Sequence, residues 1–178
     1  MNKAVFLDRD GTINIDYGYV YEIDKFKFIP GVIEALKILN DLGYILIIIT
    51  NQSGIGRKYF TEEQFNKLNN YMLEELKKHN INISKVYYCP HIDSDNCQCR
   101  KPKLELFYKA VNEFNIELTS SYVIGDKERD LSLCNNEKVK GILLTNENTS
   151  KYICKPSLLE AAKYIESTEK AKILRKDV

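Results

Sequence analysis

Short apolar runs alternate along this chain with longer segments in which apolar residues recur every three or four positions. The short runs predict β-strands, and the longer segments predict amphipathic helices. The run from Ile45 to Ile49 is apolar at every position, which is typical of a central strand covered by helices on both faces. The expected strands are Ala4–Leu7, Tyr44–Thr50, Val86–Cys89, Ser121–Ile124 and Gly141–Leu144. The expected helices are Gly31–Leu42, Thr61–His79, Leu104–Phe114, Arg129–Asn136 and Pro156–Ile165.

This order of elements predicts an α/β fold, a three-layer Rossmann-like parallel sheet with helices on both faces. Thr61 precedes a helical segment and Gln64 follows three positions later, which predicts a capping box. With 178 residues and no internal repeat, we expect residues 1–178 to form a single domain. The segments at 10–23 and 54–61 are too short to form a separate cap domain. The last dozen residues are charged, and we expect them to fray.

The charge and hydrophobicity of the chain argue against two classes of partner, nucleic acids and membranes. Lys and Arg total 26 against 25 Asp and Glu, and the net charge of +1 lacks the basic excess of a nucleic-acid surface. No run approaches the roughly 18 apolar residues of a membrane span. The first residues enter a strand directly, without the pattern of a signal peptide. We therefore expect a cytoplasmic protein that binds neither nucleic acid nor membrane, and we expect a monomer, although composition does not determine the oligomeric state.

Polar residues follow several expected strands. Asp8 and Asp10 come directly after the first strand, Thr50 and Asn51 end the second, and Asp126 follows the fourth. Ligands of a parallel sheet bind at the carboxyl ends of its strands, so these residues are candidates for one site. Two neighbouring carboxylates repel each other, so their presence suggests a purpose. A bound Mg²⁺ would offset the repulsion, and phosphoryl transfer can use a carboxylate as the acceptor. The alternative is a polar turn, because Asp and Gly are ordinary turn residues.

Two further loops can also be interpreted either as part of a reactive site or as ordinary polar turns. Thr50 begins a polar, glycine-containing loop that can donate several hydrogen bonds to a phosphate, or can be an ordinary strand-to-helix turn. Asp126 and Asp130, together with Asp8, could hold one hard cation. They could equally be solvated acidic residues at a helix N-terminus.

These motifs, taken in order from Asp8 to Asp130, resemble the four signatures of the haloacid dehalogenase superfamily of phosphatases. The resemblance implies that Asp8 is the nucleophile and that Asp10 is the general acid and then the base that activates water. It also implies that Thr50 hydrogen-bonds the transferring phosphoryl group and that Lys101 neutralises its charge. Positioning and charge neutralisation are what phosphoryl transfer chiefly needs.

The same resemblance implies a Mg²⁺ site. Its ligands would be the carboxylates of Asp8 and Asp126 and the backbone carbonyl of Asp10. Asp130 would lie behind these ligands. The intermediate implied is an aspartyl-phosphate.

Three of the five cysteines crowd into one short loop beside a histidine. Cys89 and His91 are followed by Cys97 and Cys99, a complete Cys₃His zinc set, although the spacing is not that of a zinc finger. Four protein ligands leave no open position, so we expect a structural Zn²⁺ that fixes the loop ahead of Lys101. The alternative is that these are four unrelated loop residues.

Cys-Pro-His with Cys-x-Cys-Arg-Lys-Pro narrows the resemblance to two related groups, the D-glycero-D-manno-heptose 1,7-bisphosphate phosphatases and the histidinol-phosphate phosphatases. Asp16–Ile23 and Thr50–Arg57 resemble loops of the heptose group. That group implies Mg²⁺-dependent removal of the C7 phosphate in nucleotide-activated heptose biosynthesis, as in lipopolysaccharide assembly. The short stretch between His91 and Cys97 and the residues Lys103–Glu105 depart from the usual pattern of the group.

Without a cap, the pocket for a small sugar bisphosphate must come from three loops, Gly18–Glu22, Asn51–Arg57 and Cys89–Arg100. Arg57 and Arg100 are candidates for the second phosphate, since Arg favours bidentate phosphate contacts, although Arg57 could also be a solvated loop charge. The candidate substrate-binding residues are Asp16, Tyr19, Asn51, Gln52, Ser53, Arg57, Arg100 and Lys127.

Two alternatives remain at this stage. A histidinol-phosphate phosphatase would need a site for an amino alcohol and no second phosphate, and the segment Gly18–Val20 with Arg57 argues against it. A phospho-accepting signalling domain also arranges Asp, Thr and Lys around Mg²⁺. Its acceptor Asp normally follows the third strand, whereas here the third expected strand ends at Cys89 and the acidic pair follows the first.

Overall fold

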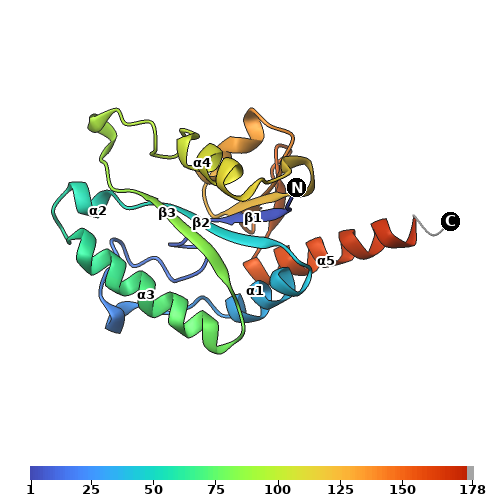
Figure 1. Ribbon diagram of the computed structural model, residues 1–178, viewed down its shortest axis with the longest axis horizontal. Helices are drawn as coiled ribbons and strands as arrows, with labels where there is room; N and C mark the ends of the chain where they lie inside the picture. Colours follow the sequence, from blue (N-terminus) through green and yellow to red (C-terminus); the bar gives the residue numbers. More distant parts are fainter. Residues whose placement is uncertain (176–178) are drawn as a thin grey trace.

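The computed structural model describes residues 1–175. Its centre is a six-stranded, wholly parallel sheet with the strand order β3-β2-β1-β4-β5-β6 (Figure 1). The strands are β1 (Ala4–Leu7), β2 (Ile45–Asn51), β3 (Ile83–Cys89), β4 (Tyr122–Gly125), β5 (Lys140–Leu144) and β6 (Ile153–Lys155).

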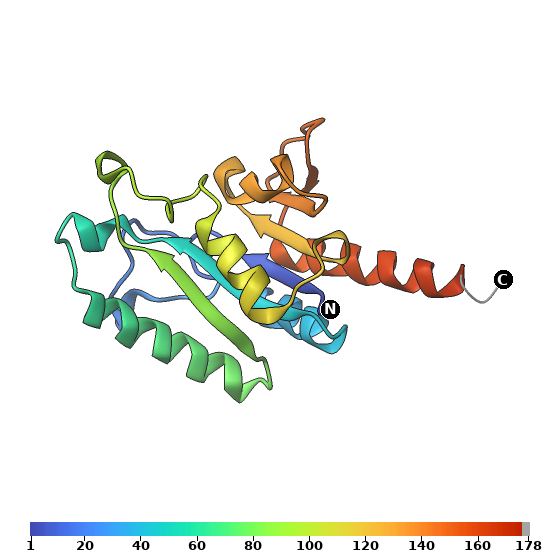
Figure 2. The same cartoon turned by 45° about the horizontal axis from the view of Figure 1, so that its top comes forward.

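Helices cover both faces of the sheet, as Figures 1 and 2 show. The helices α1 (Val32–Asp41), α3 (Glu62–Lys78) and α5 (Leu158–Leu174) lie on one face, and α4 (Glu105–Phe114) and the 3₁₀ helix η4 (Glu128–Asn135) lie on the other. The shorter helices are η1 (Ile23–Lys25), α2 (Ser53–Gly56), η2 (Asp93–Asp95) and η3 (Leu118–Ser120).

Strand β1 joins two hydrophobic cores. Val5 and Leu7 belong to the core beneath α1, α3 and α5, whereas Phe6 belongs to the core beneath α4 and η4. Phe6 packs edge-on against Phe107 of α4 with 5.6 Å between the ring centroids. Successive strand residues point to opposite faces, so a strand buried on both sides must be apolar throughout. The predicted three-layer α/β fold is confirmed.

The five predicted strands are all present, although β3 begins at Ile83 rather than at Val86. The capping box of α3 is confirmed, with Gln64 N donating to Thr61 Oγ1 and Thr61 N donating to Gln64 Oε1. The segment predicted as a helix at Arg129–Asn136 is the 3₁₀ helix η4, and strand β6 and the short helix α2 were not predicted.

The prediction that α5 ends at Ile165 and that the last dozen residues fray is wrong as far as Leu174, because α5 continues to that residue. Ion pairs along its exposed side accompany the extra turns, including Lys170 Nζ to Glu166 Oε1 at 2.8 Å. The end of that predicted segment, 176–178, lies outside the described residues.

The strand order reverses beside β1. The chain places β2 and then β3 on one side of β1 and crosses back to place β4 on the other. Leu7 pairs with Ile48 of β2 and with Ile124 of β4, so the residues that follow these three strands meet at one edge. This is the position where open parallel sheets bind ligands.

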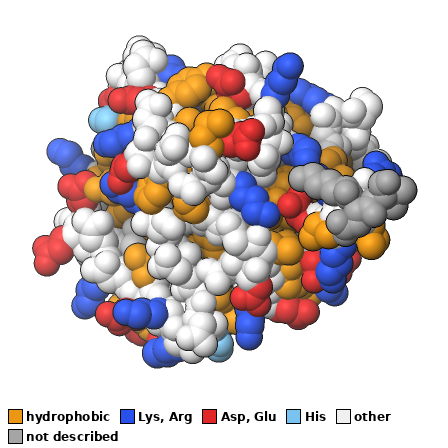
Figure 3. Space-filling model, turned by 45° about the vertical axis from the view of Figure 1, so that its right-hand side comes forward, with side chains coloured by type: hydrophobic (Ala, Val, Ile, Leu, Met, Phe, Trp, Pro, Cys, Tyr) orange, Lys and Arg blue, Asp and Glu red, His pale blue; other side chains and the backbone are white. Residues whose placement is uncertain are grey.

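The surface carries both signs of charge. Basic and acidic side chains are interspersed on the face drawn in Figure 3, in keeping with the net charge of +1. Among residues 1–175, no helix combines the length and apolarity that crossing a bilayer requires.

Candidate active site and metal loop

Lys101 lies at the centre of the cluster of charges above β1. Its side chain is buried, and Nζ lies 2.7 Å from Asp8 Oδ1, 2.7 Å from Asp130 Oδ1 and 2.7 Å from the Ile49 carbonyl oxygen. Burial alone lowers the pKa of Lys101, but the two carboxylates outweigh it and raise that pKa. The group is therefore a fixed positive charge beside Asp8.

Asp8 has an unusual environment for a carboxylate. Burial raises its pKa from 3.8 to about 7, with Asp130 and Asp10 adding to the rise and Lys101 opposing it. Its backbone N–H donates to the Ile124 carbonyl oxygen at 3.1 Å, which fixes the residue over the junction of β1 and β4. The side chain thus faces the reversal point of the sheet with its negative charge incompletely balanced.

Asp126 supplies the third carboxylate of this cluster. Carboxylate oxygens of Asp8, Asp126 and Asp130 all lie within 4.8 Å of one another. Asp126 Oδ1 is buried without a hydrogen-bond partner, and burial raises the pKa of Asp126. Gly11 has φ +86°, and a Cβ there would lie 2.5 Å from Asp126 Oδ2, so only glycine leaves this carboxylate its room. A buried carboxylate oxygen without a hydrogen-bond partner, surrounded by other carboxylates, is a suitable ligand for a hard divalent cation.

Asp130 contributes differently from Asp8 and Asp126. Its Oδ1 contacts Lys101 and its Oδ2 accepts a hydrogen bond from Lys127 N at 3.0 Å, which closes the first turn of η4. Both oxygens therefore already have partners within the protein. This matches a position behind a metal's ligands rather than among them.

Asp10 is held by donors on several sides. Asn14 Nδ2 donates to Oδ1 at 2.9 Å and Gln52 Nε2 donates to Oδ2 at 2.7 Å. The buried guanidinium of Arg9 faces both oxygens, with Nη2 at 3.0 Å from each. Still, 19% of the Asp10 side chain stays exposed, and it lines the pocket described below.

The loop after β2 connects these groups. Gln52 Nε2 also donates to Thr50 Oγ1 at 3.0 Å, so one amide joins Thr50 to Asp10. Asn51 pairs with the Lys101 peptide, donating to its carbonyl oxygen at 3.0 Å and accepting from its N–H at 3.0 Å. Both side chains therefore position other residues as well as lining the pocket.

One pocket of about 270 Å³ gathers the predicted catalytic and substrate-binding residues, whereas Asp126, a predicted Mg²⁺ ligand, is not among the residues that line it. It is lined by Asp8, Asp10, Asp16, Gly18, Tyr19, Thr50, Asn51, Gln52, Ser53, Arg57, Arg100, Lys101, Lys127, Arg129 and Asp130. All four predicted catalytic residues and all eight predicted substrate-binding residues are among these lining residues. Arg129 was missed, although it stands between the two singled-out carboxylates Asp126 and Asp130.

Three arginines from three separate segments, Arg57, Arg100 and Arg129, line this pocket. Arg100 Nε lies 2.6 Å from Asp93 Oδ1, and Arg100 Nη2 lies 3.4 Å from Asp93 Oδ2. The Asp93 carboxyl has a lowered pKa because of Arg100 first and of Arg57 and Arg129 next. An exposed carboxylate influenced by three guanidinium groups marks a region that favours anions.

Tyr19 adds one aromatic ring to the lining of the pocket. Tyr19 has φ 53° and packs edge-on against Tyr59 with 4.8 Å between the ring centroids. Asp16 Oδ1 accepts from Gly18 N at 2.9 Å, and Lys127 Nζ lies 3.6 Å from Asp16 Oδ2. This loop is therefore shaped by local hydrogen bonds and tied to the loop after β4.

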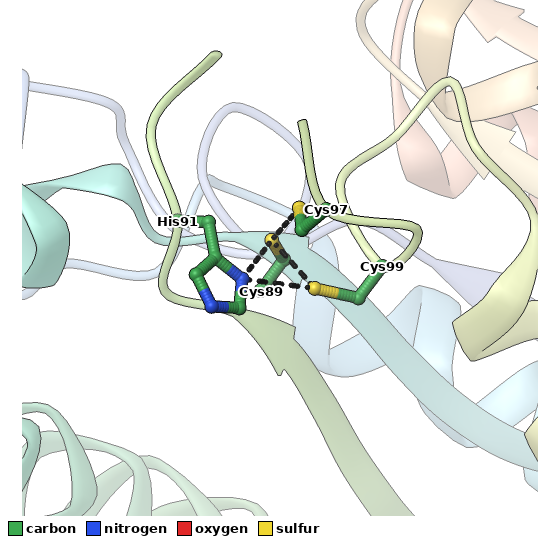
Figure 4. Close-up of side chains that lie close together, drawn as sticks. All are labelled: Cys89, His91, Cys97 and Cys99. Carbon is green, nitrogen blue, oxygen red and sulfur yellow. Dashed lines mark hydrogen bonds between the residues drawn. The ribbon is translucent and has the colours of Figure 1, made fainter. Parts of the chain in front are cut away.

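The four predicted zinc ligands lie together at the end of β3 (Figure 4). Cys89 Sγ lies 3.6 Å from His91 Nδ1, 3.6 Å from Cys97 Sγ and 2.9 Å from Cys99 Sγ. Edges of about 3.8 Å are expected for a tetrahedron built on Zn–S bonds of about 2.3 Å. None of these separations is the roughly 2.05 Å of a disulfide. The two separations of 3.6 Å are close to such an edge and the Cys89–Cys99 separation is shorter, while the donor set of three sulfurs and one imidazole fits Zn²⁺.

The loop that carries these four residues, 89–99, is hydrogen-bonded to residues 52–56 beside the pocket. Gly56 N donates to the Pro90 carbonyl oxygen at 2.9 Å, and a Cβ on Gly56 would lie 2.7 Å from that oxygen. Gln52 N donates to the Cys89 carbonyl oxygen at 2.7 Å. Because Arg100 and Lys101 follow Cys99 in the chain, the loop that gathers the sulfurs also delivers these two cations.

Comparisons with known proteins agree with this geometry. The sequence profile of the family described as haloacid dehalogenase-like hydrolase matches residues 4–136. The D-glycero-beta-D-manno-heptose-1,7-bisphosphate 7-phosphatase of Haemophilus influenzae is 50% identical over 146 residues, covering 79% of each chain. The D-glycero-alpha-D-manno-heptose-1,7-bisphosphate 7-phosphatase of Campylobacter jejuni is 46% identical over 145 residues, covering 82% of this chain and 83% of that relative.

Among solved structures, the fold is similar to the crystal structure of a D,D-heptose 1,7-bisphosphate phosphatase from B. bronchiseptica complexed with magnesium and phosphate. The TM-score is 0.86, and the match covers 93% of this chain and 99% of the other at 24% sequence identity. This likeness shows that the two chains share a fold.

Proposed function

The chain belongs to the haloacid dehalogenase-like hydrolases, and from this premise we propose that it is a phosphatase that removes the C7 phosphate of D-glycero-D-manno-heptose 1,7-bisphosphate. Relatives at 46–50% identity carry that activity in their names. The observation that carries the proposal is one pocket whose lining combines Asp8, Thr50 and Lys101 with three arginines. The three arginines supply positive charge, in addition to that of Lys101, for a second and remote phosphate.

The reaction would proceed in two steps at Asp8. In the first, an Asp8 carboxylate oxygen forms a bond to phosphorus, the bond from phosphorus to the C7 oxygen breaks, and Asp10 gives its proton to that oxygen. In the second, Asp10 takes a proton from water, the water oxygen bonds to phosphorus, and the bond to Asp8 breaks. Lys101 and Thr50 hold the phosphoryl oxygens throughout. The products are heptose 1-phosphate and inorganic phosphate.

Asp8, Asp126 and the backbone carbonyl of Asp10 are the proposed holders of Mg²⁺. The orphaned Asp126 Oδ1 and the room that Gly11 leaves for this carboxylate support that assignment. When bound, the cation would neutralise charge on the transferring phosphoryl group. It would also offset the burial that raises the pKa of Asp8.

Zn²⁺ is proposed as a structural ion held by Cys89, His91, Cys97 and Cys99. Four protein ligands close the coordination shell and leave no position for substrate. The ion's contribution would be to hold the loop whose next residues are Arg100 and Lys101.

The remote phosphate is assigned to the arginines that line the pocket, and this assignment yields a substrate prediction. A heptose 1,7-bisphosphate should have a kcat/KM about 10- to 100-fold above that of the 7-monophosphate, since hydrogen bonds to charged groups contribute about 1.5–3 kcal/mol. Steady-state kinetics on both sugars and on histidinol phosphate provide the measurement. Phosphorus NMR should identify the product as the 1-phosphate by its coupling to the anomeric proton. A higher kcat/KM for histidinol phosphate would overturn the substrate assignment.

Arg57→Ala and Arg100→Ala should shrink the preference for bisphosphate over monophosphate by about tenfold, the loss of one charge-assisted contact. The kcat/KM for the monophosphate should change little, because that substrate lacks the remote group. Lys77→Ala, an exposed change near the end of α3, is the control for removing one positive charge. If both substrates lose activity equally, the arginines do not bind the remote phosphate.

Asp10→Asn should keep the fold and lower kcat on the bisphosphate by about 10²- to 10⁴-fold, the usual contribution of a general acid–base group. An amide retains the shape of the carboxyl group, but near neutral pH it can neither give a proton to the leaving oxygen nor take one from water. Binding of the bisphosphate, measured calorimetrically, should remain within a few-fold of the parent. Near-parental kcat in this variant would remove Asp10 from the acid–base role.

A further inference from the structure

Arg9 stands between the two proposed catalytic carboxylates and is completely buried. Its guanidinium points at Asp10 rather than at solvent, with Nη2 at 3.0 Å from both carboxylate oxygens and Nε at 3.3 Å from Oδ1 and 3.2 Å from Oδ2. A planar guanidinium that meets a carboxylate in this way restricts its orientation as well as its position.

The other contacts of the guanidinium come from distant parts of the chain. Nη1 donates to Asn69 Oδ1 at 3.2 Å, and Nη2 donates also to the Val20 carbonyl oxygen at 2.9 Å. Phe65 places its ring centroid 5.3 Å from the guanidinium carbon. Asn69 and Phe65 belong to α3, whereas Val20 adjoins Tyr19 on the pocket wall. The orientation of Asp10 therefore depends on one helix and on the substrate loop together.

Burial of the Arg9 guanidinium costs free energy that an apolar side chain would not cost. A role that only the guanidinium can fill would explain why it is there. Taking a guanidinium out of water costs several kcal/mol, and paired charges in protein interiors are often replaceable by apolar residues. An apolar residue at position 9 could fill the same space against Phe65, but it could not hold the oxygens of Asp10. The geometry thus favours a role at the carboxylate over a role in packing.

We propose that Arg9 is a positioning residue: its guanidinium, braced by Asn69 and the Val20 carbonyl, holds the Asp10 carboxyl group where it meets the leaving oxygen of the substrate. This inference rests on the proposed function, because Arg9 acts only through Asp10. It also links the substrate loop to the acid, since a displacement of Val20 would move the guanidinium.

The test compares two leaving groups in Arg9→Lys, which keeps the charge but loses the planar fork. A sugar alkoxide must be protonated as it leaves, whereas p-nitrophenolate leaves without a proton. Because kcat/KM covers only the steps through loss of the leaving group, it should fall about 10²-fold for heptose bisphosphate, the low end of an acid's contribution, and less than about threefold for p-nitrophenyl phosphate. Asn69→Ala should give a smaller loss with the same selectivity.

Met72→Ala is the matched control, since Met72 is buried on the same helix in the core beneath the sheet. It should lower the melting temperature without changing the ratio of the two kcat/KM values. Equal losses on both substrates in Arg9→Lys would overturn the proposal and leave Arg9 a structural residue. If Arg9→Lys does not fold, Asn69→Ala decides by the same ratio, and an unchanged ratio there overturns it. A parental rate in Asp10→Asn would instead indicate failure of the proposed function.

Discussion

Asp8→Asn is expected to abolish turnover of every phosphate ester that the protein hydrolyses. An amide cannot serve as the nucleophile that forms the acyl phosphate, so no later step can occur. The substitution also removes one proposed cation ligand. The measurement is phosphate release over long incubations at high enzyme concentration, together with acid quenching of the parent on labelled substrate to trap the phosphoenzyme. The parent should incorporate label and Asp8→Asn should not.

The same variant should be no less stable than the parent at pH 8 in metal-free buffer. Burial raises the pKa of Asp8 from 3.8 to about 7, so the folded state disfavours the ionised form. Stability contributed by this group is therefore lost as the pH rises from about 4 to about 7. A neutral amide does not incur that loss, while Lys101 keeps Asp130 and the Ile49 carbonyl as partners.

Thermal unfolding with and without Mg²⁺ is the control for this result. If Asp8→Asn is inactive but at least as stable as the parent without metal, the substitution has removed the catalytic step and not the fold. A large drop in melting temperature would mean that the loss of activity reflects unfolding. Residual turnover above about one part in 10⁴, with no trapped intermediate in the parent, would contradict Asp8 as the nucleophile.

The sequence predicts the central strands well because their environment leaves little choice. Strands β1 and β4 are buried along their whole length, and such strands must be apolar on both faces. Strand β6 escaped prediction because its three residues are only half-buried and too short to show a period. The helix predicted at Arg129–Asn136 became a 3₁₀ helix whose first turn is closed by Asp130 accepting from Lys127 N, a contact that periodicity cannot reveal.

The meeting of Asp8, Thr50 and Asp126 could be predicted because parallel strands bring their carboxyl ends to one edge. The partners of Asn51 and Arg9 could not. Asn51 binds the Lys101 peptide, and Arg9 binds Asn69, across many intervening residues. These pairings depend on how loops and helices pack, and one chain read alone carries no signal for them. The catalytic and substrate roles assigned to the pocket residues stay predictions until the variants above are measured.

The second large expected effect is the loss of zinc from the loop that contains Cys89, His91, Cys97 and Cys99. Protein prepared without chelator should contain about one Zn²⁺ per chain, and Cys99→Ser should lose it together with much of the stability of the loop. Binding at a structural zinc site is coupled to folding. A loss of about 4 kcal/mol, equivalent to a site filled at a thousand times its dissociation constant, would lower the melting temperature by about 8–16 °C for a chain of this size.

Activity should fall in Cys99→Ser for a different reason from that in Asp8→Asn. Cys99 precedes Arg100 and Lys101, and release of the sulfur would loosen the segment that holds Lys101 Nζ at 2.7 Å from Asp8. We therefore expect a lower kcat, with a smaller change in the Mg²⁺ concentration for half-maximal activity, because Asp8 and Asp126 themselves are kept and only the contact of Asp8 with Lys101 is weakened. Metal analysis, calorimetric unfolding and a Mg²⁺ titration of the rate provide the measurements.

Cys134→Ser and Cys154→Ser are the matched controls, since both thiols lie outside the Cys₃His cluster. Neither change should alter the zinc content, and neither should reproduce the loss of kcat. If the parent contains no zinc when prepared without chelator, the structural-zinc proposal is wrong. If zinc is present but its removal shifts the Mg²⁺ requirement while leaving the melting temperature in place, the ion acts at the reacting phosphate and the loop is not its main target.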